Sequence, residues 1–232
     1  MHDAKGAIFE HRYDAGRKLA ALLEEYRGKP LVVLAIPNGG VAVGLSVALA
    51  LAADLDLVIS RKIPLPLSPE GGFGAVTDDG TIMLSEDIVK SVGLTPQQIE
   101  YQVSQVRADI RRRRLLYYRD MRPQVLSGKT AILVDDGLAS GYTMLAAVES
   151  VRHRRPQEIV VAVPVGPAST VEKVGKAVNN IVTCAVGTEP RFYVSDYYRY
   201  WHDFSDEEVV QCLKEWRIRR YQSIIELPGK GA

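Results

Sequence analysis

The chain has 232 residues, 47% of them hydrophobic and 25% charged, which is the composition of one domain with a sizeable core and at most a small appendage. Basic and acidic side chains nearly balance at a formal net charge of +1, so the chain lacks the strong positive charge typical of proteins that bind nucleic acids or membrane surfaces. The two cysteines, Cys184 and Cys212, are far apart and not in metal-ligand spacing, which argues against a zinc site and a disulfide framework.

Neither a secretion signal nor a membrane span is evident in the sequence. The first residues carry no basic region followed by an apolar stretch, and the longest apolar segment, residues 41–53, is too short to cross a bilayer. We therefore expect a soluble cytoplasmic protein whose cysteines are reduced.

Apolar, β-branched runs alternate with helical stretches along much of the chain. The expected strands are residues 31–36, 55–60, 130–134, 158–163 and 180–185, and the expected helices between them include residues 41–53, 144–154 and 170–178. Strands that are apolar throughout and alternate with helices predict an α/β domain with a parallel sheet of about five strands, covered on both faces.

The alternation stops between residues 61 and 86, where prolines and glycines gather. Three prolines and two glycines lie within residues 64–72, and neither residue type suits a helix or a central strand, so we expect a long loop. Residues 74–77 and 81–84 then read as a hairpin, because Asp78-Asp79-Gly80 suits a tight turn. Thr95 followed by Pro96 is a favourable helix start and predicts a long helix to about residue 119.

The chain is expected to divide into a core of residues 28–190 and a small hood formed by both ends, residues 1–27 and 191–232. Five aromatic residues crowd the second end segment, and they could stack on a planar ligand or simply pack the hood against the sheet. They are Phe192, Tyr193, Tyr197, Tyr198 and Trp201.

The strongest functional signal lies where the strand 130–134 meets the following helix. Asp135 and Asp136 end the strand, and a turn of small residues then opens the helix. Ligands of parallel sheets bind at the carboxyl ends of strands, and the backbone N–H groups at a helix start favour a phosphate. Two adjacent carboxylates repel each other in an empty site, which suits a diol or a cation-bearing ligand. The alternative is that the two aspartates form an Asx turn that caps the helix.

This segment resembles the phosphoribosyl pyrophosphate motif of type I phosphoribosyltransferases, in which an apolar strand is followed by two acids and a short loop ending Ser-Gly-x-Thr or Thr-Gly-x-Thr. The resemblance implies that Asp135 and Asp136 contact the ribose hydroxyls. Tyr142 replaces a residue that is commonly small, so its side chain must point away from the phosphate. The residues expected to hold the 5-phosphate are Ala139, Ser140, Gly141, Tyr142 and Thr143.

Two further segments are similar to the same family. Asn38, Gly39 and Gly40 resemble its pyrophosphate loop, whose backbone N–H groups are often presented through a non-proline cis peptide bond; by themselves they read as an ordinary glycine-rich turn. Arg61 and Lys62 stand where the family carries its mobile catalytic loop, and a basic pair there would neutralise the departing pyrophosphate. Taken singly, they read as solvated charges at a strand end.

The likeness covers nearly the whole chain and is greatest to bacterial and archaeal phosphoribosyltransferases of undefined acceptor. Where those members commonly have Pro-Arg-Gly-Gly, Asn38 replaces the arginine here. Enzymes that act on 6-oxopurines carry an acid where Ala139 stands, which disfavours hypoxanthine and guanine as acceptors. Residues shared outside the core are Phe9, Arg12, Ala15, Gly16, Leu19, Tyr198, Asp203, Phe204, Asp206, Glu207, Glu208 and Val209.

Together these features predict a type I phosphoribosyltransferase fold with a β-hairpin flap and a small hood. The resemblance implies a role in nucleotide metabolism: magnesium-dependent transfer of ribose 5-phosphate from phosphoribosyl pyrophosphate to a nitrogen of a base-like acceptor, with release of pyrophosphate. The expected catalytic residues are Asp135, Asp136, Arg61 and Lys62, and no residue is expected to bind the Mg²⁺ directly. A homodimer is expected, and neither nucleic acid nor membrane is an expected partner. The alternative is a regulatory protein that binds the ligand without turnover and uses the arginines at 107 and 111–114 on RNA or a protein partner.

Overall fold

The computed structural model describes residues 7–119, 122–188 and 191–225. Its centre is a five-stranded sheet in the order β2-β1-β6-β7-β8, in which every pairing is parallel. The strands are β1 (Leu31–Ala35), β2 (Asp54–Leu57), β6 (Thr130–Val134), β7 (Glu158–Pro167) and β8 (Asn180–Gly187). Every residue of β1 and β6 is buried, as expected for strands covered on both faces. The predicted α/β class and the parallel sheet are confirmed.

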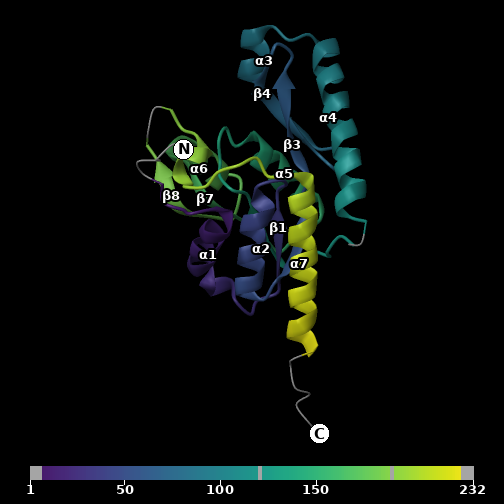
Figure 1. The fold of residues 1–232 in the computed structure, drawn as a ribbon. Coiled ribbons are helices and arrows are strands. Elements are labelled where there is room, and N and C mark those ends of the chain that lie inside the picture. The colour runs from purple at the N-terminus through teal and green to yellow at the C-terminus, as the bar shows by residue number, and fades with distance from the viewer. Residues whose placement is uncertain (1–6, 120–121, 189–190, 226–232) are drawn as a thin grey trace.

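Helices cover both faces of this sheet. One face packs against α1 (Arg12–Leu22), α2 (Gly40–Leu51) and α7 (Asp206–Ile225), and the other against α5 (Tyr142–His153) and α6 (Ala168–Gly175). Alternate residues along β6 enter the two cores: Ile132 and Val134 join the first, and Ala131 and Leu133 the second. Figure 1 shows α1, α2 and α7 side by side on the same side of the sheet.

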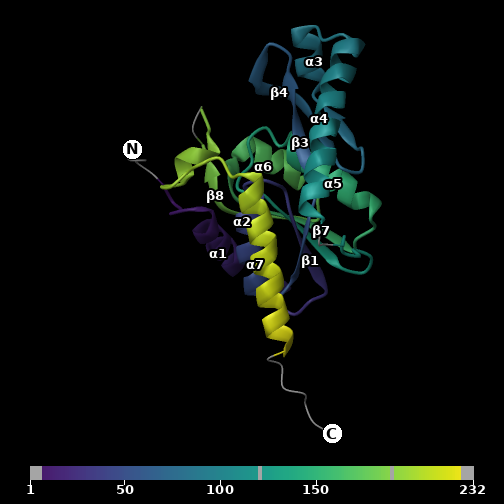
Figure 2. The ribbon, with the colours of Figure 1, turned by 45° about the vertical axis from the view of Figure 1, so that its right-hand side comes forward.

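Residues 60–117 form an arm that extends from one end of the core (Figures 1 and 2). Three antiparallel strands, β3 (Ser60–Leu65), β4 (Ser68–Thr77) and β5 (Ile82–Leu84), are followed by α3 (Glu86–Val92) and α4 (Pro96–Tyr117). The hairpin of β4 and β5 is confirmed, and so is the long helix, whose N-cap Thr95 forms a capping box with Gln98.

Two details of the arm differ from expectation. The prediction of a long loop from residue 61 is wrong, because residues 60–65 and 68–77 pair as strands. Proline is tolerated in β3 because β3 is an edge strand, and the pairing of Pro64 with Gly72 falls at an irregularity in the register. The strand expected over residues 55–60 is divided, because β2 ends at Leu57 and Ser60 already belongs to β3.

The segments around Phe9 and Tyr198, which are far apart in the sequence, pair beside the carboxyl edge of the sheet. The backbone N–H groups of Ile8 and Phe9 donate to the carbonyl of Tyr197 over 3.0 and 2.9 Å, and Arg199 donates back to Phe9 over 2.8 Å. The α1 helix that follows packs against α2 on the face of the sheet. The division into a core and a hood stays a prediction. Among the helices in the described parts of the chain, none is both long enough and apolar enough to span a membrane.

Candidate active site

A cavity of about 530 Å³ opens at the carboxyl end of β6, between the arm and the segment that precedes α7. Parallel sheets bind ligands at this edge, so its position agrees with the sequence-based expectation. Three parts of the chain line it: residues 135–144, from the end of β6 to the first turn of α5; Lys62, Glu70, Gly71, Gly72 and Gly74 of the arm; and Val194 and Trp201.

The expected phosphate loop, residues 139–143, forms one wall of the cavity. It is tied down on both sides, because Leu138 N–H donates to the Val165 carbonyl over 2.8 Å and Thr170 Oγ1 donates to the Ala139 carbonyl over 2.9 Å. Gly141 has a φ of 80° and precedes α5, and a Cβ at this position would lie 2.8 Å from Thr170 Cγ2. The loop therefore leads directly into a helix start, where backbone N–H groups have no intrahelical acceptor.

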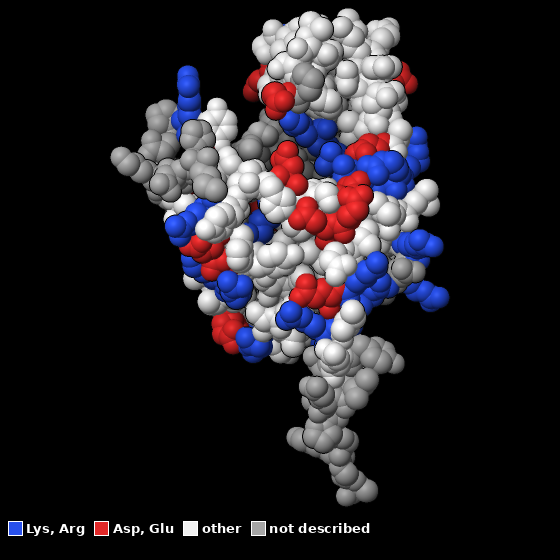
Figure 3. Space-filling model, viewed as in Figure 1, with Lys and Arg blue, Asp and Glu red and all other residues white. Residues whose placement is uncertain are grey.

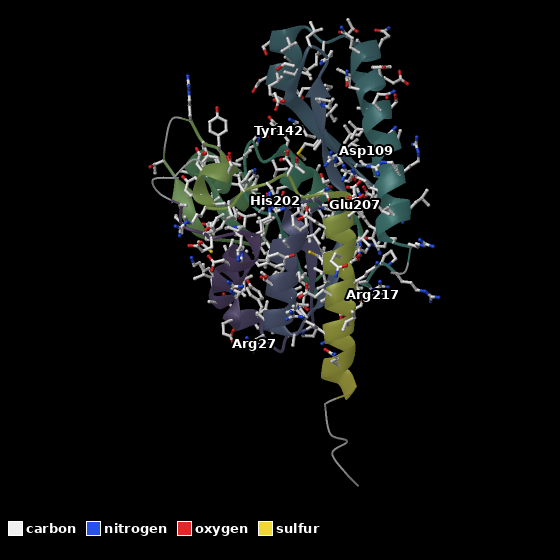
Figure 4. The ribbon with its side chains drawn as sticks, in the orientation of Figure 1. Arg27, Asp109, Tyr142, His202, Glu207 and Arg217 are labelled. Atoms are coloured by element: carbon white, nitrogen blue, oxygen red, sulfur yellow. The ribbon has the colours of Figure 1, made fainter. Side chains whose placement is uncertain are left out.

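Tyr142 is the residue of this loop that departs from the family pattern. Its ring contacts α6, since the ammonium of Lys173 lies 3.8 Å from the ring centroid. Figure 4 labels Tyr142 at the start of α5, close to α6. The side chain is thus held by a cation–π contact on the neighbouring helix.

Asp135 and Asp136 both line the cavity, but their surroundings differ. Asp136 Oδ2 accepts a hydrogen bond from Arg12 Nε over 2.8 Å, in an ion pair whose side chains are 6% and 16% exposed. Asp135 Oδ1 accepts from the neighbouring N–H of Asp136, over 2.8 Å. Burial raises the pKa of Asp135 well above its usual range, the charge of Asp136 raises it further, and Arg12 opposes both. No side chain caps α5, so the alternative in which these aspartates cap the helix is not supported.

Arg12 was expected only as part of a shared pattern near the start of the chain, and its place in the site comes from the structure. Its guanidinium lies 3.9 Å from the Trp201 ring centroid and 5.6 Å from that of Phe204, and Nη1 donates to the His202 carbonyl over 2.9 Å. Tyr198 adds a second link, because its hydroxyl donates to the Asp136 carbonyl over 2.6 Å. The segment before α7 therefore packs against the ion pair of Arg12 and Asp136 (Figure 4, where His202 is labelled).

Asn38 and Gly39 lie in the turn between β1 and α2, Gly40 is the first residue of α2, and the Pro37–Asn38 peptide bond is cis. These three residues lie behind the two aspartates and do not line the cavity. A Cβ at position 39 would collide with the carboxylate of Asp136, and one at position 40 would lie 2.8 Å from Asp135 Cα. Glycine at both positions is what allows the turn to contact the acids this closely.

Arg61 and Lys62 are neighbours on β3 and point in opposite directions, as successive strand residues do. Lys62 lines the cavity, and its ammonium donates to the Glu70 carbonyl over 2.7 Å. Gly72 makes room for it, since a Cβ there would lie 2.5 Å from Lys62 Cγ. Arg61 instead faces α4, with Nε 3.5 Å from Asp109 Oδ2. The structure thus brings one of the two expected cations to the cavity.

Most of the arginine run on α4 forms ion pairs within the chain. Arg112 pairs with Asp109 and Asp206, Arg113 with the same two acids, and Arg114 with Asp78 over 2.7 Å. In Figure 3 the basic residues of this region lie against acidic ones instead of forming a separate basic patch. These pairs favour a structural role for the run over binding to RNA.

Among the described residues, no three or more His, Cys, Asp or Glu side chains gather as a metal site would require.

The aromatic residues expected in the hood divide between packing and the cavity. Tyr198 is buried against Phe9, and Phe192 packs on Tyr197, whereas Trp201 is 37% exposed and lines the cavity.

Comparison with known proteins identifies relatives across most of the chain. The family model described as "Phosphoribosyl transferase domain" matches residues 6–195. Two proteins from strains of Mycobacterium tuberculosis, each named "putative phosphoribosyl transferase", are 36% identical over 206 residues, which is 89% of this chain and 46% of theirs. The chain thus spans about half the length of these curated relatives. A crystal structure of the protein TT1426 from Thermus thermophilus is 34% identical, with a TM-score of 0.73, and the alignment covers 90% of this chain and 98% of that one.

Proposed function

Because the chain belongs to the phosphoribosyl transferase domain family, we propose that it transfers ribose 5-phosphate from phosphoribosyl pyrophosphate to a nitrogen of a base-like acceptor and releases pyrophosphate. The observation that carries the proposal is the joint position of two acids and a phosphate-type loop in one cavity. Residues 139–143 supply helix-start N–H groups for the 5-phosphate. Asp135 and Asp136, at the end of β6, supply acceptor oxygens for the ribose hydroxyls.

In this reaction the bond from the anomeric carbon to pyrophosphate breaks while the bond to the acceptor nitrogen forms. Positive charge grows on the anomeric carbon and negative charge on the departing pyrophosphate, so a fixed cation near the departing group lowers the barrier. Lys62 is the cation of the arm that reaches the cavity, and we assign it this role. Arg61 would instead hold β3 against α4 through its ion pair with Asp109. The rest of the catalysis is positioning, and it needs no protein nucleophile.

Magnesium fits the residues present. Mg²⁺ is usually held by one or two carboxylates together with substrate phosphates, and the cavity offers the carboxylates of Asp135 and Asp136. This differs from the expectation that no residue binds the ion directly: Asp135 would be the ligand, since Arg12 already engages Asp136. The ion would arrive with the ligand and offset the charge of its pyrophosphate.

The acceptor side of the cavity is formed by Val194 and Trp201. Arg12 stacks on Trp201, which holds the indole ring in place, and a ring fixed in this way suits a planar heteroaromatic acceptor. Ala139, at the first position of the phosphate loop, has no carboxylate to meet a base nitrogen. We therefore propose an adenine-like, orotate-like or non-purine acceptor.

The test is release of pyrophosphate from phosphoribosyl pyrophosphate and Mg²⁺ across a panel of purine, pyrimidine and pyridine bases. We expect release with at least one planar base outside the 6-oxopurines and a large loss in Lys62→Ala. Tight binding of phosphoribosyl pyrophosphate, with no release of pyrophosphate in the presence of any base, would favour the alternative, a sensor without turnover. Failure of both ribose 5-phosphate and phosphoribosyl pyrophosphate to raise the melting temperature at millimolar concentration would contradict the assigned binding site.

A further inference from the structure

A partly buried polar network joins the Asn38 turn to two helices that are distant in sequence. Arg113 Nη1 on α4 donates to Asn38 Oδ1 over 2.5 Å and to Tyr117 Oη over 2.9 Å, and it forms an ion pair with Asp206 at the start of α7. Asn38 Nδ2 donates to the Phe204 carbonyl over 2.8 Å and to Asp206 Oδ1 over 3.1 Å. Both ends of the Asn38 amide are therefore engaged on the side of the turn that faces α4 and α7.

The same arginine also connects to the arm. Arg113 Nε donates to Asp109 Oδ2 over 2.8 Å, and this carboxylate oxygen lies 3.5 Å from Arg61 Nε. Arg61 precedes Lys62 on β3, so a continuous line of contacts runs from the Asn38 turn to the strand that carries the cavity's lysine. Figure 4 labels Asp109 on α4 near the start of α7, where Glu207 is labelled.

The network remains charged at neutral pH and carries an excess of positive charge. Burial would raise the pKa of Asp206, but hydrogen bonds from Tyr117, Arg112 and Asn38 and the charge of Arg113 outweigh it and lower that pKa. Three arginines, Arg61, Arg112 and Arg113, thus face two carboxylates, those of Asp109 and Asp206. Arg112 and Arg113 therefore keep both carboxylates ionised beside the Asn38 turn.

We propose that Arg113 is a positioning residue, which holds the Asn38–Gly39–Gly40 turn and strand β3 in register and thereby sets the affinity for the pyrophosphate group of the ligand. Its planar guanidinium is suited to this task because it presents several donors in fixed directions, so one side chain can bind Asn38, Asp109 and Asp206 at once. A turn fixed before binding loses less entropy when the anion binds. The inference rests on the proposed function, because it concerns the pyrophosphate half of the same site.

Two ligands separate this role from a general effect on folding. Ribose 5-phosphate would contact the phosphate loop and the acids, whereas phosphoribosyl pyrophosphate adds the group that Lys62, on the strand that Arg113 helps to hold, would meet. We expect Arg113→Met to weaken binding of phosphoribosyl pyrophosphate with Mg²⁺ by about tenfold or more, because a small displacement in a preorganised site has effects of that size. Binding of ribose 5-phosphate should change by less than about threefold. Isothermal titration calorimetry on the full chain measures both affinities.

The chain offers a matched control on the same helix. Arg112 pairs with Asp109 and Asp206 like its neighbour, but its side chain is 56% exposed and its hydrogen bonds go to those two acids and not to Asn38. Arg112→Met should leave the ratio of the two affinities unchanged. Arg113→Lys keeps the charge without the branched donor geometry, so we expect its affinity for phosphoribosyl pyrophosphate to stay as low as that of Arg113→Met. Tyr117→Phe removes only one hydroxyl of the network, so it gives a mild variant that tests the same ratio if Arg113→Met does not fold.

Each outcome bears on the proposal. A selective loss of phosphoribosyl pyrophosphate affinity in Arg113→Met and Tyr117→Phe, absent in Arg112→Met, supports it. Equal losses for both ligands, an equal effect of Arg112→Met, or full recovery in Arg113→Lys would overturn it. If the unmodified protein binds ribose 5-phosphate but none of the variants changes the ratio, the proposed function survives and the role of Arg113 does not. If the unmodified protein binds neither ligand, the proposed function itself fails.

Discussion

Two single variants, Asp135→Asn and Asp136→Asn, should change the stability of the protein in opposite directions. Asp136→Asn leaves Arg12 buried without its carboxylate, and loss of one partner of a buried ion pair costs about 3 to 5 kcal/mol. Arg12 keeps its hydrogen bond to the His202 carbonyl and its contact with Trp201, so we expect the lower end, about 3 kcal/mol. For a chain of this length, 1 kcal/mol corresponds to about 2 to 4 °C, which predicts a fall in melting temperature of about 6 to 12 °C.

Asp135→Asn should raise the melting temperature instead, because it removes a carboxylate whose charged form is disfavoured by burial and by Asp136. A carboxyl group whose pKa is raised on folding binds more protons in the folded state, so the stability of the unmodified protein falls as pH rises from about 4, the ordinary aspartate value, through the raised pKa. The gain from Asp135→Asn should accordingly be small at pH 5 and larger at pH 8.

Differential scanning calorimetry of the two single variants at pH 5, 6.5 and 8, without ligand, measures both effects. Arg12→Met combined with Asp136→Asn gives the control, because the double variant should lose less than the sum of its single variants if the pair is coupled. Titration with ribose 5-phosphate should show weaker binding in both single variants, since asparagine offers one acceptor oxygen to the ribose hydroxyls where the carboxyl group offers two. Equal losses of stability in Asp135→Asn and Asp136→Asn, or a gain from Asp135→Asn that does not depend on pH, would refute the assignment of different environments.

Three other substitutions test separate parts of the site. Lys62→Ala should reduce turnover more than it reduces ribose 5-phosphate binding, because its interaction with the departing group strengthens as the bond breaks; equal losses in kcat and affinity would point to a structural role. Gly39→Ala should destabilise the protein by about 1 to 3 kcal/mol in thermal unfolding, since its Cβ would collide with the Asp136 carboxylate, and an unchanged melting temperature would show that the turn has room. Trp201→Leu should raise the KM of the planar acceptor while ribose 5-phosphate affinity in calorimetry stays constant; a KM that does not move would exclude Trp201 from the acceptor side.

Much of the local structure could be predicted from the sequence, because it depends on residues close together in the chain. The apolar runs predicted four of the five parallel strands and the larger part of β2, and Thr95 with Pro96 predicted the start of α4. The junction of Asp135, Asp136 and the small residues after them predicted the place of the cavity, since the carboxyl ends of parallel strands meet at one edge. Prolines misled the prediction for residues 61–72, because whether a strand lies at an edge is decided by its neighbours.

Only the tertiary structure decided which side chains act together. Arg12 pairs with Asp136 across 124 residues of sequence, and Arg113 contacts Asn38 across 75. Arg61 and Lys62 look equivalent in the sequence, yet the pleat of β3 directs one to α4 and the other to the cavity. Such contacts depend on how separate helices and strands pack against one another. The sequence of a single helix or strand does not specify which distant side chain it will contact.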